Sequence, residues 1–397
     1  MGAHGGGGRR GLPRPVRRVA LYYPWIYVRS GVERVILEIV RRSRHRYTVF
    51  TNHVNYAQTY PEFSQLANLV VLEQVPVART FGAVLRAART IVAQRLDLAG
   101  YDALLVSSEG LGDLITFRNH SKPVFCFCHT PVRPVYDPVY RATWLANHPG
   151  GRIPLTLYSF AYHWVTRLAW RHYRRVFANS REVAGRIAAG SLCASDKVEV
   201  LHPGVDVDAI RPCFEYDHYF LYAGRMKWTK NVELAIDAFS TFQAQGEAGK
   251  WRLVIAGGVD ASSREYVAAL RRRAGVDGAI TFVENPSDAD LAGLYARCRA
   301  LIFPSLNEDW GIVPLEAMAH GKPVLAVNRG GPMESVVDGE TGYLLEPTAA
   351  AFASAMQRLA AHPALGERLG QCAAERVRRF SWEEFVRRLD DYIEEIA

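Results

Sequence analysis

The sequence of 397 residues contains no apolar segment long enough to cross a bilayer as a helix, which takes about 20 consecutive apolar residues. No apolar stretch follows the N-terminal arginines either, so we expect no secretory signal. These absences predict a chain that is soluble or peripherally bound, located in the cytoplasm or on the inner face of the cytoplasmic membrane.

Cysteine is scarce and scattered, with six residues at Cys126, Cys128, Cys193, Cys213, Cys298 and Cys372. Cys126 and Cys128 are too close along the chain for a zinc-finger ligand pair, and no second pair accompanies them. We therefore expect reduced thiols. Asp206 and Asp208 could be mistaken for a metal-binding carboxylate pair, but they lie in a Pro/Gly linker with no strand and turn to orient them. We predict that no metal or other cofactor is required.

The net charge of +8 is partly explained by the N-terminus, where five arginines stand in a segment without acidic residues. We predict that residues 1–15 form a disordered basic leader. No recognised nucleic-acid module accompanies the positive charge, so we expect no nucleic acid partner.

The length of the chain favours two domains. Apolar runs typical of buried strands alternate with segments of helical periodicity from Val16 onward, which predicts parallel sheets covered by helices on both faces. A Pro/Gly linker around His202–Asp208 separates the two halves. We place the N-terminal domain at 16–205, the C-terminal domain at 206–380 and a last helix at 381–397.

The stretch Ser305–Ala319 organises the second half. Pro314 predicts a helix that starts within Trp310–Val313, because proline is tolerated only in a first turn. Glu308 then lies in the loop before the helix and Glu316 inside it, eight residues or about 12 Å apart. A glycosidase carboxyl pair lies closer, at about 5 to 9.5 Å. The spacing favours two ends of one elongated ligand, such as a sugar nucleotide.

Free amides at the start of that helix would face an anionic group such as a diphosphate. Arg225 and Lys230 flank a turn after the strand predicted at Tyr219–Ala223, which suits them to neutralise a diphosphate leaving group. In the first half, a turn that ends at Gly31 joins a strand to a helix, the usual phosphate-facing connection of a nucleotide-binding domain.

A histidine and an arginine follow the buried strand predicted at Pro123–His129. Ligands of parallel sheets gather at the carboxyl ends of strands, which favours a functional role for His129 and Arg133. The alternative for His129 is a structural role in the core.

Aromatic and basic residues alternate in Leu155–Arg175. Such a segment is typical of a helix on an anionic membrane surface. It is equally typical of a domain helix with a solvated basic edge, and the sequence leaves both interpretations open.

Together these residues resemble the retaining glycosyltransferases of family 4, which have the two-domain GT-B fold. Ser305–Ala319 is similar to their E-x7-E signature, and Cys128–Arg133 to a Cys-His-Thr-Pro-x-Arg segment of members that transfer mannose in bacterial surface-polysaccharide pathways. The resemblance implies an α/β protein of two Rossmann-like domains with an interdomain cleft. It also implies that the last helix packs back on the first domain.

The resemblance assigns roles to the residues above. It implies that Glu308 contacts the donor sugar near its anomeric carbon, that Glu316 binds the ribose, and that Arg225 and Lys230 stabilise the departing diphosphate. It also implies front-face displacement, in which that phosphate assists deprotonation of the acceptor. The sequence is consistent with this, because no carboxylate in it is marked by its position as a covalent nucleophile.

His129 would sit over the donor sugar and Arg133 near the acceptor or its phosphate. Further donor contacts are implied for Gly31, Gly311, Ile312, Val313, Val283, Gly330 and Gly331. The family commonly has two adjacent glycines where this chain has Ser30 and Gly31.

We therefore predict a retaining glycosyltransferase that moves a hexose, preferably mannose from GDP-mannose, to a hydroxyl of a glycan or lipid-linked glycan. UDP-glucose and UDP-N-acetylglucosamine are the rival donors. A nucleotide-sugar epimerase of the same architecture is a third candidate, and a sugar-binding relative without activity is disfavoured by the two glutamates and two cations. Peripheral contact with an anionic membrane is part of the prediction.

Overall fold

The computed structural model describes residues 15–78, 80–148, 150–247 and 250–396. The predicted leader lies outside this range, apart from its last residue. The chain divides into two compact units, unit 1 with Met1–Phe127, Leu168–Val176 and Val386–Ala397, and unit 2 with Cys128–Arg167 and Phe177–Phe385. In the described ranges, every helix is too short or too polar to span a bilayer.

Seven strands form the first sheet, in the order β5-β3-β1-β6-β7-β8-β9. Their bounds are β1 (Arg18–Tyr22), β3 (Arg46–Thr51), β5 (Leu69–Val71), β6 (Ala103–Ser108), β7 (Val124–Cys128), β8 (Tyr173–Ala178) and β9 (Val198–Val200). β1 pairs in parallel with β3 and β6. Its residues Val19–Tyr22 are all buried, as expected where helices cover both faces of a parallel sheet. Two short strands, β2 (Trp25–Ile26) and β4 (His53–Val54), pair separately.

Unit 1 contains helices α1 (Gly31–Arg42) and α2 (Phe81–Ala93). Ser30 caps α1, because its hydroxyl accepts a hydrogen bond from the Val32 amide at 3.2 Å. The apolar residues of α1 recur at helical spacing and are buried, namely Val32, Val35, Ile36 and Ile39. This stripe is what attaches α1 to the core.

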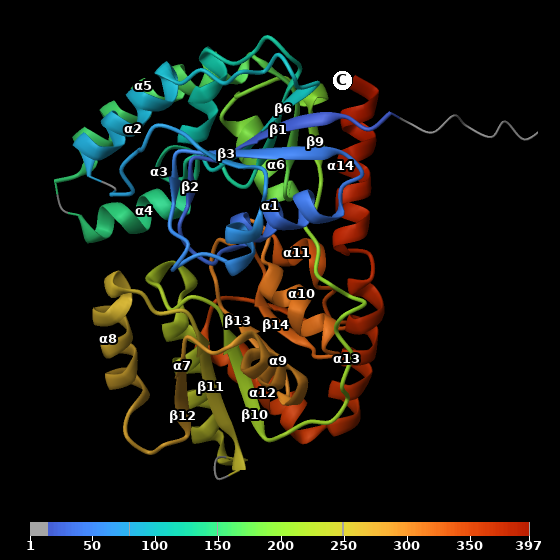
Figure 1. Cartoon of the computed structure of the whole chain (residues 1–397). Coiled ribbons are helices and arrows are strands. Elements are labelled where there is room, and N and C mark those ends of the chain that lie inside the picture. Colours follow the sequence, from blue (N-terminus) through green and yellow to red (C-terminus); the bar gives the residue numbers. More distant parts are fainter. Residues whose placement is uncertain (1–14, 79, 149, 248–249, 397) are drawn as a thin grey trace, which may run out of the picture. The chain divides into compact units, whose positions relative to one another are not determined.

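The last helix, α14 (Trp382–Ile396), ends in unit 1. There Asp390 accepts a hydrogen bond from the Ser43 hydroxyl at 2.6 Å, and Arg44 pairs with Asp391 at 2.8 Å and with Glu394 at 2.6 Å. These bonds join the C-terminal turns of α14 to the end of α1 (Figure 1).

The second sheet lies in unit 2 and has the order β12-β11-β10-β13-β14-β15. Its strands are β10 (Tyr219–Ala223), β11 (Arg252–Gly257), β12 (Ile280–Glu284), β13 (Leu301–Phe303), β14 (Val324–Val327) and β15 (Gly342–Leu345), and all pair in parallel. The helices that follow them are α7 (Val232–Phe242), α8 (Arg264–Ala274), α9 (Asp288–Arg297), α10 (Ile312–Ala319), α11 (Pro332–Ser335), α12 (Ala349–Ala361) and α13 (Pro363–Val377).

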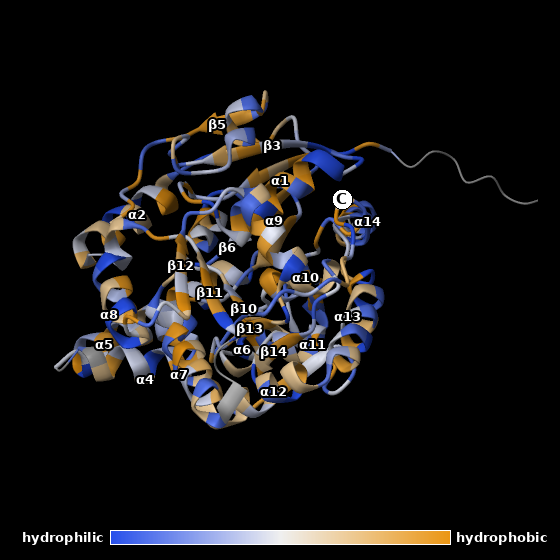
Figure 2. Cartoon of the chain, turned by 90° about the horizontal axis from the view of Figure 1, so that it is seen from below, coloured by the Kyte–Doolittle hydropathy of each residue, from blue (hydrophilic) through white to orange (hydrophobic). Residues whose placement is uncertain are grey.

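Alternate strand residues feed two cores, one on each face of this sheet. Phe220 and Ile302 pack with residues of α7 and α12, whereas Leu221 and Leu301 pack with residues of α10 and α13. This alternation follows from the two-residue period of a strand. Figure 2 shows the hydrophobic colour running along β10, β11, β13 and β14 between these helices. The predicted fold class, α/β with two Rossmann-like domains, is confirmed.

Four more helices belong to the middle of the chain, namely α3 (Arg133–Tyr136), α4 (Pro138–Asn147), α5 (Arg152–Trp170) and α6 (Arg181–Ala189). Unit 2 contains α3, α4, α6 and most of α5, because it includes Cys128–Arg167 and begins again at Phe177. The domain boundaries predicted at residues 205 and 380 follow the linker pattern rather than this division, and they stay a prediction.

Candidate functional site

The loops that carry the predicted diphosphate-binding residues and Glu308 leave one edge of the second sheet. β10 and β13 are neighbours, paired in parallel through Leu221 and Leu301. Arg225 follows β10 directly, and Glu308 lies in the loop between β13 and α10. Because the carboxyl ends of parallel strands meet at the same edge, both loops emerge side by side.

Glu308 and Lys230 form an ion pair at this edge, with 2.5 Å between Nζ and Oε2. Lys230 ends a short 3-10 turn, Trp228–Lys230, that precedes α7. Burial alone would raise the pKa of Glu308, but the charges of Lys230 and Arg133 outweigh it and hold the pKa below its ordinary value. Glu308 is therefore ionised at neutral pH, and Lys230 is already committed to it.

Glu316 lies in the second turn of α10 and is half-buried. Its Oε2 accepts a hydrogen bond from the Tyr295 hydroxyl at 2.8 Å, which ties it to α9. The start of α10 at Ile312 falls inside the range predicted from Pro314, so that prediction is confirmed. Ile312 and Val313 form the first turn of α10.

Gly311 precedes α10 with φ of +87°, a left-handed conformation that favours glycine. A Cβ atom at this position would lie 3.3 Å from Cγ of Glu308. Gly311 therefore lets the chain turn into α10 while Glu308 stays close beside it.

Gly330 and Gly331 pack on the backbone of the same loop. The Gly331 amide donates to the Glu308 carbonyl at 2.9 Å. A Cβ atom added at Gly330 would lie 2.4 Å from the carbonyl oxygen of Glu308. One added at Gly331 would lie 2.3 Å from the carbonyl oxygen of Trp310. The two glycines thus shape the Glu308 loop itself, and their predicted contact with the donor stays a prediction.

Two arginines hold the residue after Glu308. Both Arg133, at the start of α3, and Arg186, in α6, form short ion pairs with Asp309. Arg133 also donates to the Asn307 carbonyl at 3.3 Å. Its pKa is raised because the charges of Asp309 and Glu308 outweigh the opposing effect of burial.

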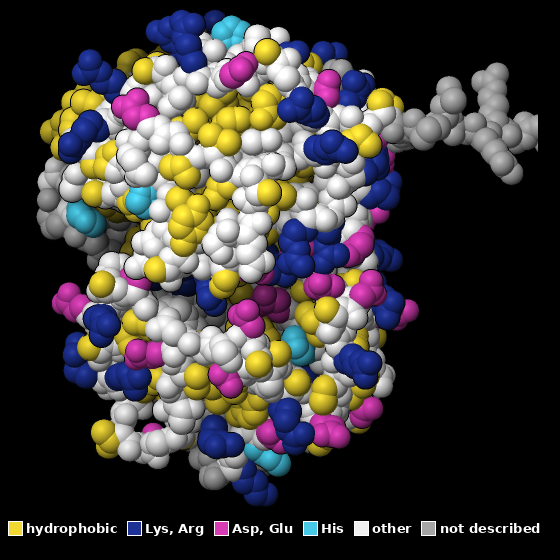
Figure 3. All heavy atoms as spheres, in the orientation of Figure 1, with side chains coloured by type: hydrophobic (Ala, Val, Ile, Leu, Met, Phe, Trp, Pro, Cys, Tyr) yellow, Lys and Arg dark blue, Asp and Glu magenta, His cyan; other side chains and the backbone are white. Residues whose placement is uncertain are grey.

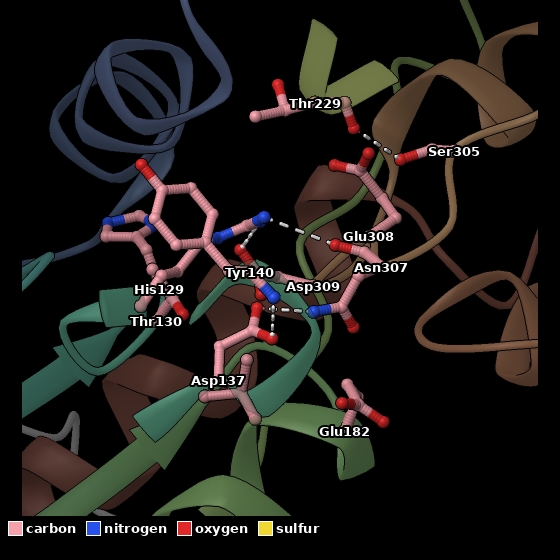
Figure 4. A network of polar contacts seen from close by, with 12 residues as sticks. His129, Thr130, Asp137, Tyr140, Glu182, Thr229, Ser305, Asn307, Glu308 and Asp309 are labelled. Carbon is pink, nitrogen blue, oxygen red and sulfur yellow. Dashed lines mark hydrogen bonds and ion pairs between the residues drawn. The ribbon is translucent and has the colours of Figure 1, made fainter. Parts of the chain in front are cut away.

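Asn307 completes this network, which Figure 4 shows. Its side-chain oxygen accepts from Arg186 at 2.8 Å, and its amide donates to Asp137, the N-cap of α4. In the segment that follows His129, Asp137 binds the Asn307 side chain and Arg133 binds Asp309. Glu308 lies between these two residues. The network therefore fixes the backbone that presents Glu308.

The sequence analysis missed Asp137, Arg186, Asn307 and Asp309. One signal could have indicated Arg186, because it stands between Val183 and Ile187 on the buried stripe of α6 and is itself only 6% exposed. A charged residue on a buried stripe needs a partner. The stretch Ser305–Ala319 contained the partner, but the sequence does not say that the two segments meet.

His129 directly follows β7, where it was predicted, and is buried. Its carbonyl accepts a hydrogen bond from the Asn179 side chain at 2.8 Å. Burial lowers the pKa of its imidazole to about 3. His129 is thus neutral at physiological pH, and its role stays a prediction.

For the remaining predicted residues, the structure gives a position in the fold but no bond to Glu308. Arg225 is exposed after β10. Val283 lies in β12, the edge strand, three strands away from β13. Gly31 begins α1 in unit 1. Their predicted contacts with the donor stay predictions.

Glu334, which follows the Gly330 and Gly331 turn, has its carboxylate engaged elsewhere. It accepts from the Arg181 amide at 2.7 Å, at the N-terminus of α6, and pairs with His202 at 2.8 Å. It therefore ties the Gly330 turn to α6 and to the linker.

No group of three or more His, Cys, Asp or Glu side chains suited to hold a metal ion occurs in the described parts of the chain. Two hollows occur in the described parts of the chain, and the Glu308 side chain lines neither, although Leu306 of the same loop lines the second. One, of about 610 Å³, lies between α4 and α5, and the other, of about 530 Å³, lies beside the first turns of α7.

Two families match the chain in succession. Residues 29–209 match Glycosyltransferase Family 4, and residues 209–376 match Glycosyl transferases group 1. The two matches meet at residue 209, close to the boundary predicted from the Pro/Gly linker.

Among curated relatives, the α-1,3/1,6-mannosyltransferase ALG2 of Dictyostelium discoideum is 35% identical over 45% of this chain and 46% of its own length. The α-1,3/1,6-mannosyltransferase alg-2 of Neurospora crassa is 25% identical over 92% of this chain and 88% of its own. In the first relative the match thus spans less than half of the protein.

Among solved structures, Anabaena Alr3699/HepE in complex with UDP and glucose superposes with a TM-score of 0.74, covering 96% of this chain and all of that one. The sequence identity is 18%, so this likeness concerns the fold.

Proposed function

Because the chain belongs to the family 4 glycosyltransferases with the GT-B fold, we propose that it is a retaining enzyme that transfers mannose from GDP-mannose to a hydroxyl of a glycan or lipid-linked glycan. The observation that carries the proposal is the ion pair between Lys230 and Glu308 beside the first turn of α10. The pair supplies a cation and an ionised carboxylate, and the first turn of α10 supplies free amides at the same edge of the sheet.

The chemistry to be catalysed separates a sugar cation from a diphosphate anion. A diphosphate that approaches the first turn of α10 would meet unpaired amides and the positive end of the helix dipole. Lys230 and Arg225 would add positive charge on the opposite side, where electrostatic stabilisation of the leaving group contributes most.

The diphosphate would compete with Glu308 for Lys230. Once Lys230 turns to the phosphate, the Glu308 carboxylate becomes free to face the sugar near its anomeric carbon. Asn307 and Asp309 would keep Glu308 in place during this exchange, because both are held by groups that the diphosphate does not replace. Glu316 would bind the ribose from within α10.

Mannose is supported by the relatives of D. discoideum and N. crassa, which are α-1,3/1,6-mannosyltransferases. UDP-glucose remains the second candidate, because the Anabaena protein of the same fold was solved with UDP and glucose. A hydroxyl of a glycan or lipid-linked glycan as the acceptor is part of the same proposal. Peripheral contact with an anionic membrane and catalysis without a metal belong to the proposal, with Arg225 and Lys230 taking the place of a divalent cation.

The test is thermal unfolding in the presence of a panel of sugar nucleotides. A ligand that binds only the folded protein, at about a hundred times its dissociation constant, stabilises by about 2.7 kcal/mol. GDP and GDP-mannose should raise the melting temperature, with or without EDTA, and UDP-glucose should not. NMR of the reaction with an acceptor glycan should show an α-linked product. An epimerised sugar nucleotide without transfer, or stabilisation by UDP-glucose alone, would overturn the assignment.

A further inference from the structure

Helix α5 has two apolar faces, and only one of them is covered. The covered face consists of Leu155, Ser159, Tyr162, Thr166, Ala169 and Trp170, all buried. On the other face, spaced by three and four residues, stand Ile153, Leu157, Phe160, Trp164 and Leu168. Ile153 is 73% exposed, Leu157 and Phe160 are each 67% exposed, and Trp164 is 51% exposed. A helix of a soluble domain normally carries one apolar stripe, so the second stripe indicates an interaction surface.

The partner of this surface must tolerate positive charge. The sequence has no Asp or Glu between Asp137 and Glu182, while the interval contains seven arginines, at Arg141, Arg152, Arg167, Arg171, Arg174, Arg175 and Arg181. Figure 3 shows hydrophobic side chains next to Lys and Arg side chains in the upper left of the view, the region where Figure 1 labels α2 and α5. An anionic partner is complementary to such a surface.

A hollow lined by cationic side chains opens next to the exposed stripe. It lies between α4 and α5, has a volume of about 610 Å³, and is lined by Arg141, His148, Arg152 and Thr156 among others. Arg141 donates to the hydroxyls of Thr156 at 3.1 Å and Ser159 at 3.4 Å, which carry no charge. In the described ranges, no carboxylate forms an ion pair with Arg141 or Arg152, so the hollow retains its positive charge.

Trp164 lies on the exposed stripe beside another stripe residue and an arginine. Its ring lies 6.4 Å from that of Phe160, and the Arg167 guanidinium lies 5.6 Å from its centre. Tryptophan is favoured at the level of lipid headgroups, and arginine keeps its charge in water while its stem covers apolar surface. This combination suits a membrane interface better than a dry protein core.

We propose that this surface, defined as Ile153, Leu157, Phe160 and Trp164 together with Arg141 and Arg152 and called the α5 surface, docks on an anionic phospholipid bilayer. The apolar side chains enter the boundary between headgroups and acyl chains, and the hollow faces a headgroup phosphate. From Ile153 to Trp164 the stripe extends about 16 Å along the helix, which fits a helix lying in the plane of the interface. The inference rests on the proposed function, because an enzyme that uses a lipid-linked acceptor meets that acceptor at the membrane surface.

A second copy of the chain fits the α5 surface less well. In a symmetric dimer the same surface would face itself, and the arginines of one copy would lie opposite those of the other. Like charges placed across an interface are costly, whereas a bilayer with anionic lipids offers the opposite charge.

The experiment is co-sedimentation of the full chain with vesicles of phosphatidylcholine alone, or of phosphatidylcholine mixed with phosphatidylglycerol. We expect binding to the mixed vesicles that weakens as salt is added. The double variant R141Q/R152Q should bind the mixed vesicles about thirtyfold more weakly, at about fivefold for each charge near an anionic surface. The double variant L157S/F160S should lose at least about tenfold, because it removes two apolar anchors. The matched control is V276S, at a fully exposed valine outside α5.

Equal binding to both kinds of vesicle, or unchanged binding of L157S/F160S, would overturn the proposal. A wild-type dimer that L157S/F160S converts to a monomer in analytical ultracentrifugation would overturn it too, in favour of a second copy. The rise in melting temperature with GDP is measured on the same variants. If GDP stabilises all of them, a failure of vesicle binding concerns the α5 surface alone, whereas wild-type protein that ignores every nucleotide but binds vesicles would refute only the proposed glycosyl transfer.

Discussion

The contact between Arg186 and Asp309 allows a quantitative test of how the Glu308 loop is held. The side chains of Arg186 and Asp309 are 6% and 14% exposed. Removing one partner of a buried pair leaves an uncompensated charge, which costs about 3 to 5 kcal/mol. Asp309→Leu removes the carboxylate that Arg133 and Arg186 share, and Arg186 keeps Glu182 at 3.1 Å and Asp137 at 3.7 Å as charged partners, so the cost of the substitution should fall within that range. Arg186→Met should cost about 2 kcal/mol, because Arg133 still compensates Asp309.

The double variant distinguishes a true pair from two independent losses. Arg186→Met with Asp309→Leu replaces both charges by apolar groups, so the two costs should not add. We expect a coupling energy of at least about 1.5 kcal/mol. The assay is urea unfolding of the four proteins, followed by tryptophan fluorescence, with the wild type closing the cycle.

An exposed pair in the same unit serves as control. Arg273 and Asp237 form two hydrogen bonds of 2.6 Å, with side chains 50% and 36% exposed. The same cycle on that pair should give about 0.5 kcal/mol, because solvent screens it. A coupling between Arg186 and Asp309 no larger than that of the control would refute the claim that this contact holds the Glu308 loop.

Three further predictions concern the site. Glu308→Ala should mainly lower kcat, whereas Glu316→Ala should mainly raise KM for the donor, and steady-state kinetics that show equal effects on both parameters would contradict this division. The pKa of His129 is lowered to about 3, so below about pH 6.5 the unfolded chain binds a proton at this residue that the folded chain does not, and His129 should by itself contribute a loss of about 1.4 kcal/mol of stability per pH unit down to pH 3. His129→Gln should remove that part of the slope in melting temperature against pH. Gly331→Ala should lower both kcat and the melting temperature, because its Cβ atom would meet a backbone oxygen at 2.3 Å, whereas Gly185→Ala, in open space on α6, should be neutral or stabilising by up to about 1 kcal/mol.

Much of the architecture could be predicted from the sequence, because it depends on local patterns. Apolar runs gave β10 at its observed bounds, and Pro314 set the start of α10. The positions of His129 and Glu308 at strand ends followed from the same patterns. Shorter elements such as β2, with two residues, leave no periodic signal, and β15 was missed because it begins with glycine and is only half-buried.

The tertiary structure alone decided which side chains meet. Asp309 pairs with residues 123 and 176 positions away, Asn307 with one 170 positions away, and Glu334 with the start of α6. No periodic pattern encodes such contacts, because they depend on how separate elements pack. The sequence by itself determined most of the longer elements, the order of the strand-end loops and the candidate residues of the site. The fold determined that Lys230 already neutralises Glu308, and that the loop between β13 and α10 is held from both sides by buried charge, since burial makes those pairings obligatory.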